Sequence, residues 1–290
     1  MTAFSQIRGR RAGLPARLAE FGRRSPTIVI GAAILIFMAC VAILAPLLAG
    51  DPTFINPVDR LQPPSGTYYF GTDHLGRDIF ARCVYGARVS LIVGLSVAAL
   101  AVAGGLAIGL AAGYLRSVDN LVMRLMDGLM AIPAILLAIA LVSLNQGGVV
   151  IVIVAITIPE IPRVVRLVRS VVLTTREQPY IEAAISGGSR KLKIILRHIL
   201  PSTIPPLIVQ ATYVAASAIL IEAGLSFLGA GVPPETPTWG NIVASSRLLL
   251  ARAPWTIFFP GACLALVVLA INLLGDGLRD HLDPRLARRM

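Results

Sequence analysis

Residues 182–201 read EAAISGGSRKLKIILRHILP, and this polar stretch between two strongly apolar regions decides how the chain is organised. It holds the only two lysines of the sequence, Lys191 and Lys193. Glycine accepts backbone angles that other residues resist, so the pair at 187–188 predicts a turn. The residues after the turn predict a helix with one basic and one apolar face. The stretch is therefore either a compact docking surface or a solvated loop with some helix in it. The apolar residues at helical spacing are Leu192, Ile195, Leu196 and Ile199.

The composition of the chain indicates an integral membrane protein. Of its 290 residues 56% are hydrophobic and 14% are charged, and the mean hydropathy is +0.79. Soluble domains usually have about 45–50% apolar and about 25% charged residues. The net charge of +11 could suggest nucleic acid, but basic and aromatic residues do not alternate as they do in nucleic-acid motifs. The three cysteines, Cys40, Cys83 and Cys263, predict no disulfide framework.

Six apolar runs predict six transmembrane helices, because a helix needs roughly 20 apolar residues to cross a bilayer. The first run is longer than the usual signal-peptide core of about 7–15 residues, so we expect it to be retained. Pro133 predicts a kink in the third run, and Pro159 and Pro162 predict a bend in the fourth. We therefore expect an all-α integral membrane protein with a six-span domain at 28–275. The runs are 27–50, 89–112, 125–144, 149–165, 203–228 and 257–274.

The distribution of basic residues predicts the orientation of these spans. The tail 1–27, which could form an interfacial helix, the loop 163–197 and the tail from 276 to 290 hold six, eight and four basic residues. The loops 51–88 and 229–256 hold four and two. Basic residues collect on the cytoplasmic side, so both termini are expected there and both of these loops outside. In the second outer loop, Trp239 and Trp255 are candidates for membrane-interface anchors.

The first outer loop contains a cluster of polar side chains that could suggest a metal site. Asp73, His74 and Asp78 lie within six residues of one another. One histidine and two aspartates in a turn are weak evidence for a metal, and hydrogen bonding within the turn is the better interpretation.

No pattern typical of catalysis stands out in the sequence. The chain has no Gly-x-Ser-x-Gly, no His-Glu-x-x-His and no phosphate-binding loop, so we do not expect it to hydrolyse ATP by itself. Three acidic residues lie within or beside the spans, namely Asp127, Glu160 and Glu222. Each is expected to form an ion pair or a hydrogen bond, with Arg124 and Arg163 as nearby partners. Asp127 and Glu160 are expected near the inner ends of their spans and Glu222 near the outer end of its span, an arrangement that gives little support to a proton-coupled transporter, which would prefer carboxylates near the membrane centre.

Several motifs in the right order resemble one family. Residues 182–201 resemble the EAA motif of bacterial ABC-importer permeases, with Gly188 and the pair 200–201 at the expected distances. His198 departs from the isoleucine that many members carry there. Other stretches resemble the second permease of the dipeptide, oligopeptide and nickel subfamily. They are FGTDHLGRD (70–78), GARVSL (86–91), EAGLSFLG (222–229), PTWG (237–240) and NLLGDGLRD (272–280).

This resemblance implies a type I ABC-importer fold and a non-catalytic transport subunit in a bacterial inner membrane. It implies four kinds of partner: a second permease, two ATPase subunits or domains that bind ATP and magnesium, an extracytoplasmic binding protein and lipid. No cofactor is expected on this chain. Di- and oligopeptides are the expected substrates, and nickel or another small solute is the second choice. The alternative class of protein is an ion-coupled secondary transporter.

The resemblance also implies roles for individual residues. The cytoplasmic loop 169–202 would seat in an ATPase groove, and parts of the outer loops would receive the binding protein. The expected coupling residues are Glu182, Ala183, Ala184, Gly188, Leu192, Ile195, Leu196 and Pro201. The expected binding-protein contacts are Asp73, His74, Arg77, Asp78 and Trp239.

Overall fold

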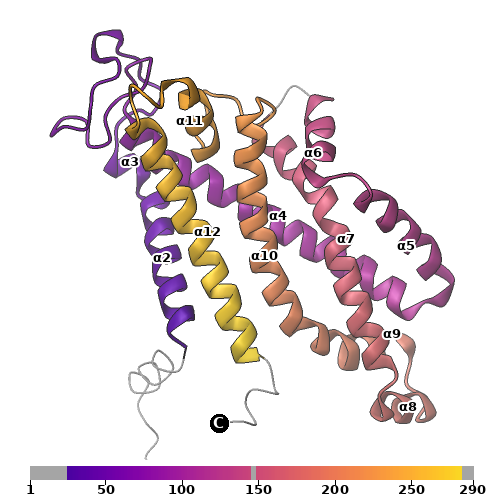
Figure 1. The fold of residues 1–290 in the computed structure, drawn as a ribbon. Helices are drawn as coiled ribbons and strands as arrows, with labels where there is room; N and C mark the ends of the chain where they lie inside the picture. Colours follow the sequence, from indigo (N-terminus) through magenta and orange to yellow (C-terminus); the bar gives the residue numbers. More distant parts are fainter. Residues whose placement is uncertain (1–24, 145–147, 283–290) are drawn as a thin grey trace, which may run out of the picture.

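The computed structural model describes residues 25–144 and 148–282, and within these ranges the chain is helical (Figure 1). The only strand-like feature there is an isolated antiparallel bridge between Thr72 and Asp78. Most of both predicted tails lies outside the described residues. The helices are α2 (Pro26–Ile43), α3 (Ala45–Leu48), α4 (Ile79–Tyr114), α5 (Arg116–Met130), α6 (Ala134–Ser143), α7 (Val149–Arg176), α8 (Pro179–Ser186), α9 (Lys191–Ile194), α10 (Leu200–Phe227), α11 (Trp239–Ser246) and α12 (Trp255–Leu282). Short helical turns also form at Pro57–Asp59, Ile195–Ile199 and Arg247–Leu249.

Four of the described helices are long and apolar enough to cross a membrane by themselves. They are α2, α4, α12 and the nearly continuous segment Lys191–Phe227, which contains α10. Helices α5 and α6 together could form a fifth, broken span. Helix α7 carries Glu160 and several arginines, yet it packs along α4 and beside α10.

The predicted third span differs from a simple kinked helix. Between Met130 and Ala134 the chain turns by 86°, so that α5 and α6 are two separate helices. Pro133 lies at the start of α6, where proline is tolerated because the first turn of a helix has no internal partner for its nitrogen. The residue that predicted a kink thus marks the boundary between two helices.

Glycine residues allow α4 and α7 to pack closely. A Cβ atom at Gly109 would lie 2.7 Å from Cβ of Val168, and one at Gly113 would lie 2.7 Å from Cβ of Val172. These distances are too short for a real side chain, so each valine occupies the space that a missing methyl group leaves. Close packing of this kind is the main attraction between helices in lipid.

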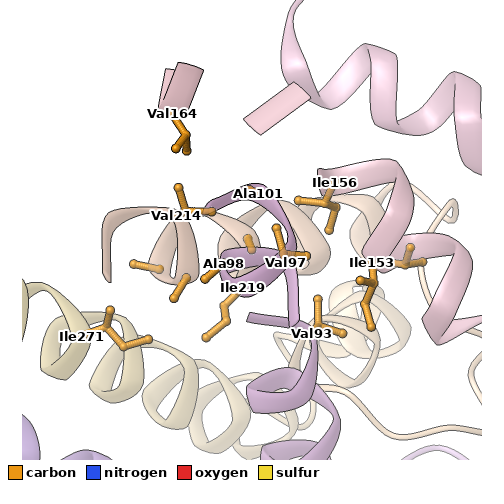
Figure 2. Packing of buried hydrophobic residues seen from close by; sticks show 14 of the residues in the cluster. Val93, Val97, Ala98, Ala101, Ile153, Ile156, Val164, Val214, Ile219 and Ile271 are labelled. Atoms are coloured by element: carbon orange, nitrogen blue, oxygen red, sulfur yellow. The ribbon is translucent and has the colours of Figure 1, made fainter. Parts of the chain in front are cut away.

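The core continues from this contact toward α10 and α12. Figure 2 shows Val93 and Val97 of α4 packed among Ile153 and Ile156 of α7 and Ile219 of α10. All five side chains are buried. Helix α4 crosses behind the other helices in Figure 1 and contacts α2, α7, α10 and α12, so it links α2 and α12 to α7.

Several helices extend beyond the apolar runs that predicted them. Helix α4 begins at Ile79, so the first predicted outer loop ends at residue 78 and not at 88, and α7 continues to Arg176. Helix α11 lies within the second predicted outer loop. Figure 1 shows the start of α2, the end of α12 and the α8–α9 region at the same end of the molecule.

Candidate functional site

The segment that follows α7 folds into a short helix and a tight turn. Helix α8 starts at Pro179, which suits the first position of a helix, and carries Glu182 in its first turn. At its other end Gly188 has a φ of +73°. The N–H of Gly188 donates to the carbonyl of Ile185 at 2.9 Å, and the N–H of Ser189 donates to that of Ala184 at 3.0 Å. This pair of hydrogen bonds around a left-handed glycine is the Schellman motif, so Gly188 performs the turn that the sequence predicted.

Three isoleucines fix this segment against the rest of the protein. Ile181 of α8, Ile194 of α9 and Ile199 are buried in the same cluster as Val172 of α7. The segment is therefore held firmly on the end of α7 and is no free loop.

A second set of apolar side chains in the segment faces outward. Leu192 is 66% exposed and Leu196 is 53% exposed, and Ile185 of α8 is also exposed. Ile195 is half-buried, so it contributes less to this surface than the sequence predicted. Glu182, Ala183, Gly188 and Pro201 are exposed and Ala184 is half-buried. We call the exposed part of residues 180–201 the docking surface.

The three acidic residues that the sequence analysis singled out, Asp127, Glu160 and Glu222, all have partners, as predicted. Glu160 is buried and forms an ion pair with Arg163, at 3.3 Å between Oε1 and Nη1. Asp127 pairs with Arg166 of α7 at 2.6 Å, rather than with Arg124 of its own helix. Glu222 is also buried, and its Oε1 accepts a hydrogen bond from Ser226 at 2.8 Å.

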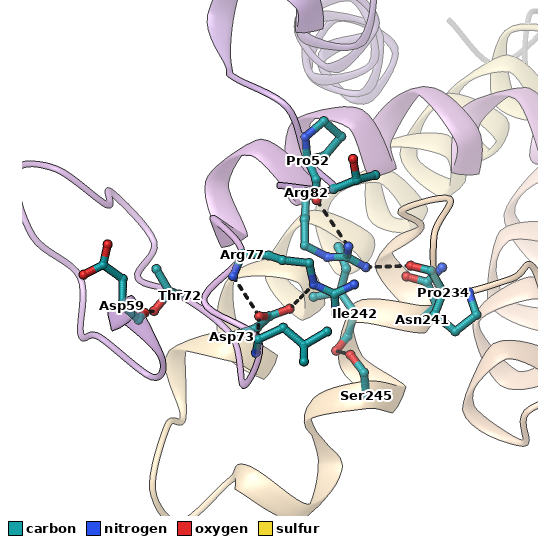
Figure 3. A network of polar contacts seen from close by, with 12 residues as sticks. Pro52, Asp59, Thr72, Asp73, Arg77, Arg82, Pro234, Asn241, Ile242 and Ser245 are labelled. Atoms are coloured by element: carbon teal, nitrogen blue, oxygen red, sulfur yellow. Dashed lines mark hydrogen bonds and ion pairs between the residues drawn. The ribbon is translucent and has the colours of Figure 1, made fainter. Parts of the chain in front are cut away.

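The loop before α4, which was predicted to be the first outer loop, is held by a network of polar contacts (Figure 3). The carboxylate of Asp73 accepts hydrogen bonds from the N–H groups of Leu75 and Arg77 at 2.8 and 2.9 Å, and from Nε of Arg77 at 2.7 Å. Arg82 of α4 donates to the carbonyls of Pro52 and Pro234, at 3.4 and 3.2 Å, and so ties the two predicted outer loops together. The interpretation of this region as a hydrogen-bonded turn is confirmed, and no group of three metal-ligating side chains occurs in the described residues.

The predicted binding-protein contacts are only partly at the surface. Asp73 and Arg77 are buried, whereas His74 and Asp78 are half-buried. Asp78 caps α4 by accepting a hydrogen bond from the N–H of Phe80 at 2.9 Å, and burial raises the pKa of its carboxyl group. Contact between these residues and a binding protein stays a prediction.

Trp239 has a different place from the one the sequence suggested. Its side chain is completely buried, and Nε1 donates to the carbonyl of Cys83 at 3.0 Å. The prediction of a membrane-interface anchor is therefore wrong for this residue, because the indole packs between α11 and α4. Trp255 is half-buried and donates to the carbonyl of Thr72 at 3.3 Å.

Comparison with known proteins defines the class of protein to which this chain belongs. Residues 104–288 match the model of the family described as binding-protein-dependent transport system inner membrane component. Residues 23–64 match the N-terminal transmembrane domain of oligopeptide transport permease C. The chain belongs to the first of these families, and it is a permease subunit of an ABC importer, a multi-pass protein of the inner membrane. Such permeases are not catalytic, and separate ATPase subunits hydrolyse ATP.

Individual relatives agree with this assignment. The chain is 60% identical over 270 residues, 93% of each chain, to y4tQ of Sinorhizobium fredii, named a probable peptide ABC transporter permease protein. It is 44% identical to the dipeptide transport system permease protein DppC of Alkalihalophilus pseudofirmus, over 91% of this chain and 88% of that one. It is 34% identical to the oligopeptide transport system permease protein OppC of Bacillus subtilis, over 92% and 88%.

A solved structure supports the fold. The inward-facing MetNI methionine ABC transporter contains a chain that matches with a TM-score of 0.58 and 20% identity, over 70% of this chain and 96% of that chain. At this level of identity the match establishes the fold alone, and it agrees with the predicted type I importer architecture.

Proposed function

We propose that this chain is one of two related permeases in an ATP-driven importer of di- and oligopeptides. The support for the substrate class is that the relatives at 60%, 44% and 34% identity are all named as peptide, dipeptide or oligopeptide permeases. The same motifs that resemble this subfamily in the sequence extend through α4, α10 and α12.

The proposed topology has six spans and both termini in the cytoplasm. The spans are α2, α4, the broken pair α5–α6, α7, α10 and α12. Two observations support this arrangement. The start of α2 and the end of α12 lie at the same end of the molecule as the docking surface (Figure 1). The docking surface at that end carries Arg190, Lys191, Lys193 and Arg197, as is typical of the cytoplasmic side.

The docking surface is proposed to seat in a groove of a partner ATPase subunit. The observation that carries this proposal is that Leu192 and Leu196 are exposed although isoleucines of the same segment are buried. An apolar helix face in a groove is a recurrent way of recognising a partner. Glu182 would pair with a basic group of the ATPase, and ATP with magnesium would bind to that partner. Closure of the ATPases would then move α8 and, through it, α7.

Two substitutions at the docking surface test this role. Leu192→Asp places a charge in the proposed interface, and Glu182→Arg reverses the proposed ion pair. Each is expected to reduce co-purification of the ATPase subunits with the permease while membrane insertion is retained. Leu248→Asp is the matched control, because Leu248 is 89% exposed but belongs to the outer loop after α11. Normal capture and normal transport by both docking-surface variants would refute the proposal.

The substrate is tested separately. We expect the cognate extracytoplasmic binding protein, purified with its native ligand, to release peptides that mass spectrometry can identify. Nickel or a non-peptide solute in its place would overturn the proposed substrate class but not the assignment as a permease.

A further inference from the structure

A polar cluster lies between α7 and α10, away from both the docking surface and the outer loops. The carboxylate of Glu160 accepts a hydrogen bond from Ser217 of α10 at 3.2 Å and pairs with Arg163 at 3.3 Å. Nη1 of Arg163 also donates to the hydroxyl of Tyr213 at 3.4 Å, and the guanidinium lies 5.8 Å from the centre of the tyrosine ring. Tyr213 and Ser217 are four residues apart and therefore share one face of α10.

The position of this cluster along the helices places it within the membrane. A Cβ atom at Gly104 of α4 would contact Ile161, and one at Gly105 would meet Val164, so Glu160 and Arg163 lie level with these glycines. The apolar run of α4 continues from there to residue 112, which is roughly 12 Å at 1.5 Å per residue. The hydrocarbon region is about 30 Å thick, so the cluster lies inside it, deeper than the inner end of the span where the sequence analysis expected Glu160.

One edge of the cluster is exposed, although its centre is buried. Glu160 is fully buried, whereas the side chain of Arg163 is 39% exposed and Tyr213 is 51% exposed. Within the described residues the hydrogen bonds of Arg163 all involve Nη1. The remaining guanidinium donors at the exposed edge are therefore available to a ligand.

Lipid cannot be the normal neighbour of this edge. A charged group in hydrocarbon is expensive, and ionisable residues in membrane helices almost always face protein or a water-filled cavity. The neighbouring arginine in the same direction along α7, Arg166, is also exposed and paired with Asp127 of α5. This face of α7 therefore carries polar groups from mid-membrane toward the docking surface.

We propose that Arg163 and Tyr213 form a contact site for the translocated peptide, which rests on the proposed function as a peptide permease. The guanidinium and the phenol would donate hydrogen bonds to backbone carbonyl and terminal carboxylate oxygens. All peptides carry these groups, so the contact would not depend on the peptide's side chains. Glu160 does not reach the path. It is a positioning residue, which holds Arg163 in place through the ion pair.

The small net charge of the cluster suits a transient binding site in a translocation path. Because the buried carboxylate of Glu160 balances the charge of Arg163, a peptide meets a nearly neutral pair of donors and not a free cation. Binding in a translocation path has to be favourable enough for entry and weak enough for release. A lone arginine at this depth would hold a carboxylate more tightly and slow its exit.

The first test asks whether the site faces water in the assembled transporter. In a background with Cys40→Ala, Cys83→Ala and Cys263→Ala, Tyr213→Cys is treated with a negatively charged, membrane-impermeant methanethiosulfonate. The complete complex is used, with and without ATP and loaded binding protein. We expect labelling that changes with the nucleotide state. The control is Phe37→Cys, which replaces an exposed residue of α2 that we expect to face lipid. The proposal is overturned if position 213 is not labelled in any state, or no faster than position 37, because the second permease or lipid would then cover this face.

The second test separates a peptide contact from a structural role. Arg163→Gln in the reconstituted complex should lower uptake of the peptide released by the binding protein by about tenfold, as expected for the loss of one charged hydrogen bond. The ATPase activity stimulated by the binding protein and the assembly of the complex should persist, and Arg163→Lys should restore part of the uptake. Arg124→Gln, which removes an exposed arginine of α5, is the control for the loss of charge. Unchanged uptake, or a parallel fall in ATPase activity and assembly, would overturn the proposal.

These results can be distinguished from failure of the proposed function itself. If the wild-type complex does not import peptide at all, the substrate class is wrong. If the wild type imports peptide and Arg163→Gln does so equally well, only the contact site is wrong.

Discussion

Arg169 of α7 and Asp119 of α5 form a two-point ion pair, with 2.5 Å between Nε and Oδ1 and 2.6 Å between Nη2 and Oδ2. Bidentate pairs of this kind fix the relative orientation of two helices as well as their distance. A second pair, Arg166 with Asp127, joins the same helices. Helix α5 is thus fastened to the helix that leads into the docking surface. A movement of α8 would therefore reach the broken α5–α6 pair through α7.

The ion pair predicts a rescue by charge exchange. We expect Asp119→Lys to reduce uptake because it places two positive charges together, and we expect the addition of Arg169→Asp to restore part of it. Both side chains are partly exposed, at 19% and 29%, so solvent weakens the pair to about 1 kcal/mol or less. Thermal unfolding of both single alanine variants and the double variant measures this coupling. If the losses of stability in the two single variants add up to the loss in the double variant, the ion pair contributes nothing to stability.

The contact between α4 and α7 predicts an effect of adding a single methyl group. Gly109→Ala would force its Cβ atom against Val168, and overpacking of this kind costs about 1–3 kcal/mol. Thermal stability in detergent should fall, and the double variant with Val168→Ala should recover part of the loss.

Gly128→Ala is the matched control for that experiment. Gly128 lies in α5 with no atom within 4 Å of the added Cβ. Because alanine favours a helix over glycine by about 1 kcal/mol, this variant should be neutral or slightly stabilised. Equal destabilisation by both alanine substitutions would contradict the packing argument.

Much of the fold could be predicted from the sequence because its signals are local. The apolar runs have the length of a membrane span, and the helices formed where these runs occur. The turn after α8 could also be predicted, since Gly188 supplies a backbone conformation that few residues adopt.

Helical spacing could not predict which apolar side chains of the segment before α10 face the core. An α-helix would have placed Leu192, Leu196 and Ile199 on one face, but residues 195–199 form a π-helical turn. In such a turn residues five apart lie above one another, and Ile194 and Ile199 are the buried pair. The irregular turn therefore reverses which apolar residues face the core and leaves Leu192 and Leu196 outside.

The break between α5 and α6 had a signal in the sequence, but nothing in the sequence indicated its angle of 86°. Pro133 indicated an interruption. The angle depends on where α5 packs, and α5 is held by arginines of α7 that lie 39 and 50 residues away in the sequence. The burial of Trp239 has the same cause, since its hydrogen-bond partner, the carbonyl of Cys83, is 156 residues away.

The buried ion pair between Arg77 and Asp73, in the first predicted outer loop, predicts a local loss of stability when it is broken. Arg77→Ala removes the partner of Asp73, whose carboxylate would remain buried with only backbone N–H donors. We expect a loss of about 2 kcal/mol in the local stability of the loop. Cleavage by a protease added to the outer side should become faster. Arg60→Ala, which changes an exposed arginine of the same loop, should leave cleavage unchanged. If Arg77→Ala is as resistant as the wild type, the ion pair does not hold the loop.

The turn after α8 predicts a graded response at Gly188. Its φ of +73° costs a residue with a Cβ atom about 1–2 kcal/mol, but no atom lies within 4 Å of the position that this Cβ would take. The effect should therefore follow backbone preference and not side-chain size. Gly188→Asn should retain most coupling between ATP hydrolysis and uptake, because asparagine tolerates this conformation, whereas the β-branched Gly188→Val should lose it. The ratio of peptide imported to ATP hydrolysed, measured in proteoliposomes, checks the order. If asparagine impairs coupling as strongly as valine, then the glycine is needed for close contact with the ATPase and not for the turn.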